Sequence, residues 1–280
     1  MNIHWFPGHM TKSLRMMDEN VKLMDMLVYV LDSRAPASCI NPVFNKYTEK
    51  LPVVYVLNKA DLGDKTELDA WKKKLSGPKS VVITLNSTMT GSGKAIFPLA
   101  KQLCAEKIER LKAKGVRAVL RAMVIGVPNC GKSTLINNLC GKAKATTGNK
   151  AGVTRGKQWV KVAEYLEILD TPGTLYPKFD NEKFAKHLAY VGSIKDEIVD
   201  SYELCLEFIK EITLLDKSIL ENRYKIECSI DSIETLGRIA AARGLMLRGG
   251  TPDEERAATA VIDDFRKGRL GKITLDKADD

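Results

Sequence analysis

Short runs of apolar and β-branched residues alternate with longer polar stretches along the first 170 residues of the chain. Such continuous runs are typical of strands buried on both faces of a sheet, and the polar stretches between them are of helix-forming composition. The alternation predicts an α/β fold with a mostly parallel sheet, whose sites lie at the carboxyl ends of its strands. The five runs occupy residues 26–31, 53–57, 81–85, 119–125 and 165–169.

Helical patterns occupy most of the remaining sequence. Residues 1–24 are expected to form a lead segment followed by an amphipathic helix, and residues 94–114 a basic helix that Gly115 closes. A further helix is expected to begin with Ser133–Leu139, directly after the fourth apolar run.

The character of the sequence changes after about residue 178. Apolar residues recur there at helical spacing, and Thr251, Pro252 and Glu254 form a pattern typical of a helix start, with Thr251 as the N-cap. We therefore predict two domains, an α/β domain at 1–177 and an all-helical domain at 178–280. The clearest helical spacing is that of Leu204, Phe208, Ile209 and Ile212.

Composition and charge narrow the class of protein. The chain has 280 residues, of which 44% are hydrophobic, so it has enough apolar side chains for a core and no run long enough to span a membrane. The start matches neither a signal peptide nor a transit peptide, which favours a cytoplasmic protein without membrane contact. Six cysteines without any C-x-x-C pair predict reduced thiols rather than a zinc site. A net charge of +9 favours a polyanionic partner, although solvated basic faces are an alternative.

Residues 126–133 read G-V-P-N-C-G-K-S, a phosphate-binding loop between a predicted strand and a predicted helix. Backbone N–H groups of such a loop surround the phosphates, with Lys132 expected at the β- and γ-phosphates, where it also serves catalysis. Ser133 is expected to bind Mg²⁺. Cys130, Gly131 and Thr134 adjoin these residues and are expected to contact the nucleotide as well.

A second phosphate-sensing motif, D-T-P-G, follows the last apolar run at residues 170–173. Asp170 is expected to hold Mg²⁺ through water, and the Gly173 N–H to sense the γ-phosphate. Between the two motifs, Thr154 is expected to bind Mg²⁺ when the γ-phosphate is present, and so to take part in catalysis. Thr146 and Thr147 are the alternatives for this switch role.

The guanine-reading motif N-K-x-D is found at residues 58–61. The Asp61 carboxylate is expected to accept hydrogen bonds from N1–H and the exocyclic amine of guanine, a donor pair that adenine lacks. Asn58 and Lys59 complete the motif, and a backbone N–H of Asn86-Ser87 is expected to reach the guanine carbonyl oxygen, although a plain surface loop is an alternative there. The chain is thus predicted to bind GTP and GDP.

The order of the motifs is reversed, because ordinary small GTPases carry the phosphate loop before N-K-x-D. The sequence therefore predicts a circularly permuted P-loop GTPase domain, rejoined at termini that lie close together in space. In this arrangement the switch segment leads directly into the helical domain.

The chain resembles the circularly permuted bacterial GTPases of large-subunit assembly over nearly its whole length. The resemblance implies a GTPase that binds the large (50S) ribosomal subunit, through 23S rRNA and ribosomal proteins, and promotes its late maturation, with hydrolysis stimulated by the particle. The matching segments are F-P-G-H-M at 6–10, D-S-R-A-P at 32–36, N-K-A-D at 58–61, G-V-P-N-C-G-K-S-T at 126–134, D-T-P-G at 170–173 and F-R-K-G-R-L-G at 265–271.

The hydrolytic machinery departs from that of Ras-type GTPases, which orient the attacking water with a Gln after D-x-x-G. Thr174 and Leu175 follow here, so intrinsic turnover should be slow. The resemblance carries a catalytic role to His9, whose imidazole could orient water; a surface or RNA-contacting histidine is the alternative. His187 is expected to be structural. A GTP-dependent binding module with negligible hydrolysis is the alternative function.

Asn129 suggests a second catalytic device. In related GTPases an Asn at this position of the phosphate loop helps to bind K⁺, which supplies the charge of an arginine finger. We therefore expect K⁺ beside Mg²⁺, although an Asn that caps its own loop is the alternative.

Basic residues suggest where RNA binds. A stretch without acidic residues contains Trp159 and is expected either to read rRNA phosphates or to form a solvated loop. The helical domain carries further basic residues, for which salt bridges between helices are the alternative. We expect a monomer. The two sets are Lys142, Lys144, Lys150, Arg155, Lys157 and Lys161, and Arg238, Arg243, Arg248, Arg266, Lys267, Arg269 and Lys272.

Overall fold

The computed structural model describes residues 8–141, 158–177, 179 and 181–279. Within these ranges, six strands form one sheet in the order β3-β2-β1-β4-β6-β5. Neighbours from β3 to β6 run parallel, whereas β5 runs antiparallel to β6 at one edge. The α/β class with a mostly parallel sheet is therefore confirmed. The strands are β1 (Met26–Asp32), β2 (Val53–Asn58), β3 (Ser80–Leu85), β4 (Leu120–Ile125), β5 (Gln158–Ala163) and β6 (Leu166–Asp170).

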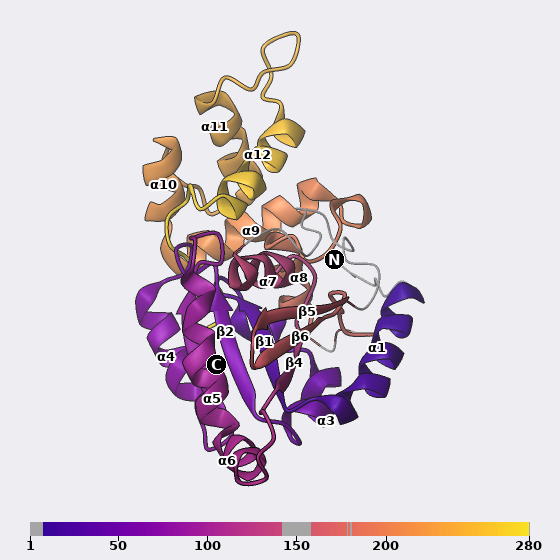
Figure 1. The fold of residues 1–280 in the computed structure, drawn as a ribbon. Coiled ribbons are helices and arrows are strands. Elements are labelled where there is room, and N and C mark those ends of the chain that lie inside the picture. Colours follow the sequence, from indigo (N-terminus) through magenta and orange to yellow (C-terminus); the bar gives the residue numbers. More distant parts are fainter. Residues whose placement is uncertain (1–7, 142–157, 178, 180, 280) are drawn as a thin grey trace.

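Helices cover the sheet and continue beyond it, as Figure 1 shows. Short 3₁₀ segments join some of them in the described ranges, at Val21–Leu23, Pro42–Phe44, Ser92–Ala95 and Asp196–Ile198. No helix in the described ranges has the length and apolarity needed to cross a bilayer. The helices are α1 (Gly8–Asn20), α2 (Pro36–Cys39), α3 (Asn45–Thr48), α4 (Lys65–Leu75), α5 (Ile96–Leu103), α6 (Ala105–Ala113), α7 (Lys132–Cys140), α8 (Glu182–Tyr190), α9 (Ser201–Asp216), α10 (Ser218–Tyr224), α11 (Ser232–Ala242) and α12 (Glu254–Arg266).

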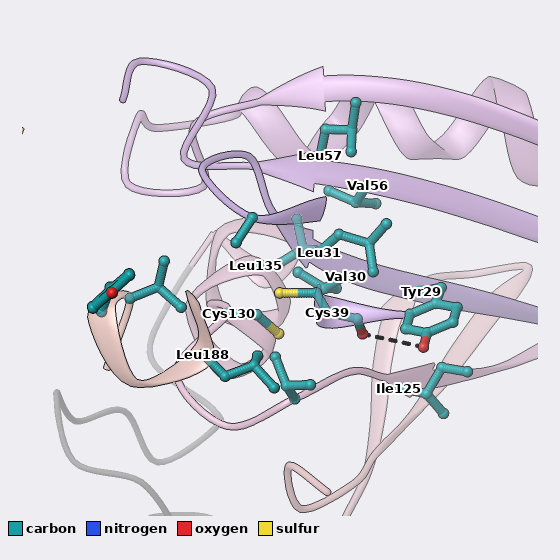
Figure 2. Close-up of a cluster of buried hydrophobic side chains, with 14 of the residues drawn as sticks. Tyr29, Val30, Leu31, Cys39, Val56, Leu57, Ile125, Cys130, Leu135 and Leu188 are labelled. Atoms are coloured by element: carbon teal, nitrogen blue, oxygen red, sulfur yellow. Dashed lines mark hydrogen bonds between the residues drawn. The ribbon is translucent and has the colours of Figure 1, made fainter. Parts of the chain in front are cut away.

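The centre of the sheet is fully apolar because both of its faces are covered. Every residue of β1 is buried, and so are all residues of β4 except Arg121. Figure 2 shows Leu188 of α8 in one buried cluster with side chains of β1 and with Cys130 of the phosphate loop. The first helix after β6 is thus packed into the α/β core. The six cysteines are free thiols, as expected from the sequence.

Strand β5 was not predicted, because the sequence pattern assigned this region to a basic loop. Its side chains alternate weakly: Val160 is buried, while Trp159 and Lys161 on either side are exposed. A half-buried edge strand with a bulge near Lys161 carries little hydrophobic signal.

Two helix boundaries also differ from the prediction. The expected helix at 94–114 breaks at Cys104, which lies outside helical geometry between α5 and α6. Gly115 does close α6, with φ of +68°. The start of α12 lies later than expected, because the Asp253 side chain, not Thr251, caps it by accepting from the Arg256 N–H.

The helical part beyond β6 forms its own core. The four residues with helical spacing in α9 are all buried, and α9 packs against α11 and α12. After α12 the chain turns back to the α/β part, where the Lys74 side chain of α4 donates to the Ala278 carbonyl. Figure 1 accordingly shows the C-terminus beside the sheet, far from the outer end of the helical part.

Candidate nucleotide-binding site

Parallel strands bring the predicted motifs to one edge of the sheet. Asp32 at the end of β1 pairs in register with Asn58 at the end of β2. The phosphate loop follows the neighbouring strand β4, and Asp170 ends β6. Sequence segments more than one hundred residues apart therefore meet where doubly wound folds bind their ligands.

Asn58 connects the guanine motif to the phosphate loop. Its buried amide donates to the Cys130 carbonyl at 2.8 Å and accepts from the Ser87 N–H at 3.0 Å. Contact with the loop is so close that a Cβ on Gly131 would lie 2.1 Å from the Asn58 amide nitrogen. Asn58 thus fixes the relative position of three loops, while Asp61, three residues on, is exposed.

Lys59 has a left-handed backbone, with φ of +57°, and its ammonium group bridges two partners. It donates to the Asn129 carbonyl of the phosphate loop at 2.8 Å and pairs with Asp32 at 2.7 Å. The guanine motif is therefore held against the phosphate loop by Lys59.

Asp32 was not assigned a role from the sequence. The fully buried carboxylate accepts two hydrogen bonds from the Arg34 guanidinium, at 2.8 and 2.7 Å, as well as the ion pair from Lys59. Burial alone would raise the pKa of Asp32, but the charges of Arg34 and Lys59 lower it far below its ordinary value. Asp32 stays ionised and fixes the Lys59 ammonium.

Two glycines allow the phosphate loop its path. Gly126 has φ of +150°, and a Cβ there would lie 2.4 Å from the Val30 carbonyl oxygen; Gly131 has φ of +100°. The Lys132 side chain is buried and folds back along the loop, donating to the Gly126 and Val127 carbonyls at 3.1 and 2.8 Å.

Cys130 lies in the phosphate loop, and Ser133 and Thr134 lie at the start of α7. The Cys130 thiol is buried, and burial raises its pKa, so it is a packing group rather than a nucleophile. Ser133 and Thr134 are half-buried in the first turn of α7. The N–H groups in the first turn of a helix lack partners within the helix, which suits them to anion binding.

Asp170 is the least satisfied polar group of the site. Its carboxylate is fully buried, and neither oxygen has a hydrogen-bond partner within the described residues. Burial raises the pKa of Asp170 to about 6, and the nearby Lys132 charge opposes the rise only in part. Buried carboxylate oxygens without partners fit a divalent cation and its water ligands.

Gly173 packs directly on the phosphate loop. A Cβ there would meet the backbone of Pro128 at 2.6 Å and the Lys132 ammonium at 2.9 Å. Only glycine fits at this approach. Beyond it, Thr174 and Leu175 are both fully buried, and the Leu175 N–H contacts the sulfur of Met10 in α1 at 3.5 Å.

The loop after β3 is held from two sides. Ser87 is buried and directs its N–H at Asn58, whereas the Asn86 side chain accepts from Thr88 and stabilises its own turn. Asn138 of α7, which sequence reasoning missed, donates to the Ser87 and Met89 carbonyls at 3.0 and 2.6 Å. An Asn one turn beyond a phosphate loop carries no signal in the sequence alone.

Asn129 faces the helical part. Its backbone is left-handed, with φ of +62°, and its amide donates to the Gly192 carbonyl at 3.1 Å. Next to it, the Ser193 hydroxyl donates to the Pro128 carbonyl at 2.8 Å. Two hydrogen bonds thus join the phosphate loop to the connection between α8 and α9.

His187 is structural, as expected. Fully buried in α8, it contacts Asp276 near the C-terminus at 2.5 Å and Glu211 of α9 at 2.6 Å. Burial alone would lower the pKa of His187, but hydrogen bonds to these two carboxylates and their charges raise it to about 9. The cationic ring therefore joins three segments of the chain.

Several predicted residues are not described by the structure. Thr154, its alternatives Thr146 and Thr147, and the basic residues from Lys142 to Lys157 lie outside the described ranges. The backbone of His9 lies in α1, but its side chain is not among those described. Of the basic stretch, Trp159 and Lys161 are exposed on β5.

Basic side chains of the helical part are largely engaged in ion pairs. Arg243 and Arg269 pair with the buried Asp264, and Arg266 pairs with Asp196. Salt bridges therefore account for these three; those of Arg243 and Arg266 join different helical segments, as the alternative considered from the sequence has it, whereas that of Arg269 lies within α12 and its end. Arg238 and Lys267 pair within their own helical segments, and Arg248 and Lys272 are exposed.

Comparison with known proteins agrees with this geometry. Residues 121–232 match a family model described as "50S ribosome-binding GTPase". The chain is 37% identical to ribosome biogenesis GTPase A of Bacillus licheniformis over the full length of both chains. It is 30% identical to the protein of the same name from Thermotoga maritima, over 99% of this chain and 95% of that one.

A solved structure is similar over almost the whole chain. GNP-bound YlqF from Thermotoga maritima has a TM-score of 0.66 at 26% identity, covering 96% of this chain and 99% of that one. The GDP-bound structure gives a TM-score of 0.67. The likeness extends through the helical part as well as the sheet.

Proposed function

The chain belongs to the ribosome biogenesis GTPase A family, and from that membership we propose that it binds the large (50S) ribosomal subunit and promotes its late maturation. It is a circularly permuted GTPase that binds GTP and GDP and acts in ribosome biogenesis. In the proposal, 23S rRNA and ribosomal proteins are the partners of a cytoplasmic monomer, and the particle stimulates hydrolysis.

The junction between the phosphate loop and the helical part carries this proposal. The hydrogen bonds from Asn129 to Gly192 and from Ser193 to Pro128 join the nucleotide site to the connection that leads into α9. A change in the bound nucleotide would thereby alter the position of the connection to α9. By linkage, binding of the helical part to a particle would alter the phosphate loop. Such reciprocity is what particle-stimulated hydrolysis requires.

Magnesium fits the site through Asp170 and Ser133. The unpartnered carboxylate oxygens of Asp170 suit a cation held through water, with Ser133 and Thr154 as direct ligands. When bound, Mg²⁺ would neutralise charge on the β- and γ-phosphates. Lys132 would bind the same phosphates, and the Gly173 N–H would donate to the γ-phosphate.

Base recognition falls to the guanine motif. Asp61 would accept from guanine, with Asn58 and Lys59 holding its loop, and the N–H groups of Asn86-Ser87 would approach the carbonyl oxygen of the base. Support comes from the exposure of Asp61 beside the buried Asn58.

Hydrolysis needs a water-orienting group, because the buried Thr174 and Leu175 replace the Gln of Ras-type enzymes. We propose His9 for this role. Its neighbour Met10 packs against the Leu175 N–H, so the start of α1 adjoins the segment that follows Gly173. His9→Ala should slow particle-stimulated turnover about a hundredfold and leave GTP affinity unchanged; stimulated turnover at the wild-type rate would exclude His9.

Potassium is proposed as a second cofactor at Asn129. The Asn129 amide nitrogen donates to the Gly192 carbonyl, which fixes this side chain at the phosphate loop. Turnover should be faster in K⁺ than in Na⁺, and Asn129→Ala should abolish the difference. Equal rates in the two salts for the wild type would contradict this role.

RNA contact is proposed for the exposed basic residues rather than for the paired arginines. Trp159 and Lys161 of β5 and Arg248 beyond α11 are exposed. Phosphate contacts of this kind make affinity fall steeply with salt. Binding to 50S particles that is insensitive to salt would contradict the electrostatic part of the proposal.

Co-sedimentation tests the function as a whole. The protein is mixed with separated 30S and 50S subunits in the presence of GDP, a non-hydrolysable GTP analogue or no nucleotide, and GTP turnover is measured in parallel. We expect the analogue to favour sedimentation with 50S and the particle to accelerate turnover. Binding to 50S without acceleration would favour the alternative function, a GTP-dependent binding module with negligible hydrolysis. Equal binding to both subunits would contradict the proposal.

A further inference from the structure

The segment after α12 lies directly behind the guanine motif. Gly268, with φ of +71°, approaches so closely that a Cβ there would lie 2.5 Å from a methyl carbon of Leu62. Five residues later, the Ile273 N–H donates to the Leu62 carbonyl at 3.0 Å. Leu62 follows Asp61 immediately, so the far side of the guanine loop is covered by residues 265–276.

Thr274 bridges the two loops that form this site. Its hydroxyl donates to the Ser33 carbonyl at 2.9 Å and accepts from the Asp64 N–H at 3.0 Å. Ser33 in turn donates its own N–H to the Asn58 carbonyl at 2.9 Å. Thr274 is 2% exposed, so water cannot replace these bonds without a rearrangement.

Arg34 makes a second connection to the same segment. While two of its nitrogens bind Asp32, the third donates to the Arg266 carbonyl at 3.1 Å. Its guanidinium also lies over the Phe265 ring, 5.3 Å from the centroid. Since Asp32 holds Lys59, the end of α12 is linked through two side chains to the guanine motif.

The segment itself is well anchored, which lets it hold the loops. The Asp276 carboxylate accepts from the Ser38 N–H at 2.7 Å, and the Trp71 indole donates to the Asp276 carbonyl at 2.9 Å. The Leu275 N–H donates to the Arg34 carbonyl at 2.7 Å. These contacts join the segment to α2, to α4 and to the loop after β1.

We propose that Thr274 is a positioning residue for guanine recognition, and that the segment 265–276 and the bound nucleotide stabilise one another. Thr274 fixes the distance between the Ser33 and Asp64 backbones, and this distance sets where Asn58 and Asp61 face the base. Linkage then requires that the nucleotide also favours the docked segment. The inference rests on the proposed guanine role of residues 58–61.

Thr274→Val tests the proposal, because it removes the hydroxyl and preserves the shape. Thr235→Val is the matched control. Thr235 is equally buried, and its hydroxyl also accepts from one N–H and donates to one carbonyl, both of Ser229, within the helical part. Each variant loses two hydrogen bonds of the same kind, but only Thr274→Val loses them near the guanine motif.

Affinities for GDP and for inosine diphosphate are measured by calorimetry. Inosine lacks the exocyclic amine. Displacement of Asp61 should therefore lower the affinity for GDP more than the affinity for inosine diphosphate. Thr274→Val should lower GDP affinity about tenfold and reduce the ratio of GDP affinity to inosine diphosphate affinity. Thr235→Val should leave the GDP affinity and this ratio near their wild-type values. A wild-type preference in Thr274→Val, or an equal loss in both variants, would overturn the proposal.

Hydrogen exchange provides a second readout for folded protein. GDP should slow exchange at the Ile273 and Leu275 amides of the wild type, and should slow it less in Thr274→Val. Unchanged exchange in the wild type would contradict the coupling. If the wild type itself binds GDP and inosine diphosphate equally, the guanine assignment of residues 58–61 fails, and the inference fails with it.

Discussion

His187→Gln should make protein stability depend less on pH. In the wild type the His187 ring lies between the Asp276 and Glu211 carboxylates, and together they raise its pKa to about 9. Glutamine keeps a polar group of similar reach but carries no charge. The variant therefore isolates the contribution of the buried cation.

The size of the effect follows from the difference between the folded pKa of about 9 and the ordinary value near 6.5. At about 1.4 kcal/mol for each pKa unit, the protonated ring contributes about 3 kcal/mol to the free energy of unfolding. Because the folded pKa is raised, this contribution is complete below pH 6.5 and is lost as the pH rises through 9. The variant should thus be less stable by about 3 kcal/mol at pH 6.5, and the difference should shrink towards pH 10.

Urea unfolding, followed by circular dichroism between pH 6 and 10 without nucleotide, measures this difference. Ser38→Ala is the control, because it removes a hydroxyl that donates to the same Asp276 carboxylate at 3.1 Å without removing the cation. Its loss should be about 1 kcal/mol at every pH. If the difference between His187→Gln and the wild type is constant from pH 6 to 10, the ring is not a buried cation and the reasoning is wrong.

Two further predictions concern the phosphate side of the site. Asp170→Asn should remove the dependence of GDP affinity on Mg²⁺, because the unpartnered carboxylate is the proposed attachment of the ion; titrations with Mg²⁺ or with EDTA check this, and a variant that still responds to Mg²⁺ would contradict it. Gly173→Ala should lower GTP turnover about a hundredfold, since a Cβ would lie 2.6 Å from the Pro128 backbone. GDP affinity should change little, and single-turnover rates with wild-type values would show that the contact can relax.

The strands and the nucleotide motifs could be predicted because their signals are local. A continuous apolar run such as residues 53–57 marks a strand buried on both faces, and polar residues at its carboxyl end mark a site. The glycines of the phosphate loop are an equally local signal, because positive φ favours glycine at positions such as Gly131. Parallel pairing then brings these ends together without further information.

The features that the sequence did not predict depend on contacts between residues far apart in the chain. The break at Cys104 and the exposed edge strand β5 reflect packing that no helical or alternating pattern records. In the sequence, Asp32 and Arg34 only follow an apolar run, and their contacts become visible once Lys59 and Phe265 are placed around them. The cap at Asp253 was missed because Thr251 and Pro252 formed an equally good local pattern.

The return of the chain after α12 has a consequence for the order in which the protein matures during synthesis. The loops of β1 and β2 are made early, but Thr274, which joins them, is made 210 residues after Asp64 and 241 residues after Ser33. Chains emerge from the N-terminus, and bonds of such sequence separation form late. A partly synthesised chain can therefore fold its sheet before the Thr274 hydrogen bonds to Ser33 and Asp64 form. Nucleotide affinity should accordingly reach its full value only after the residues beyond α12 have been translated.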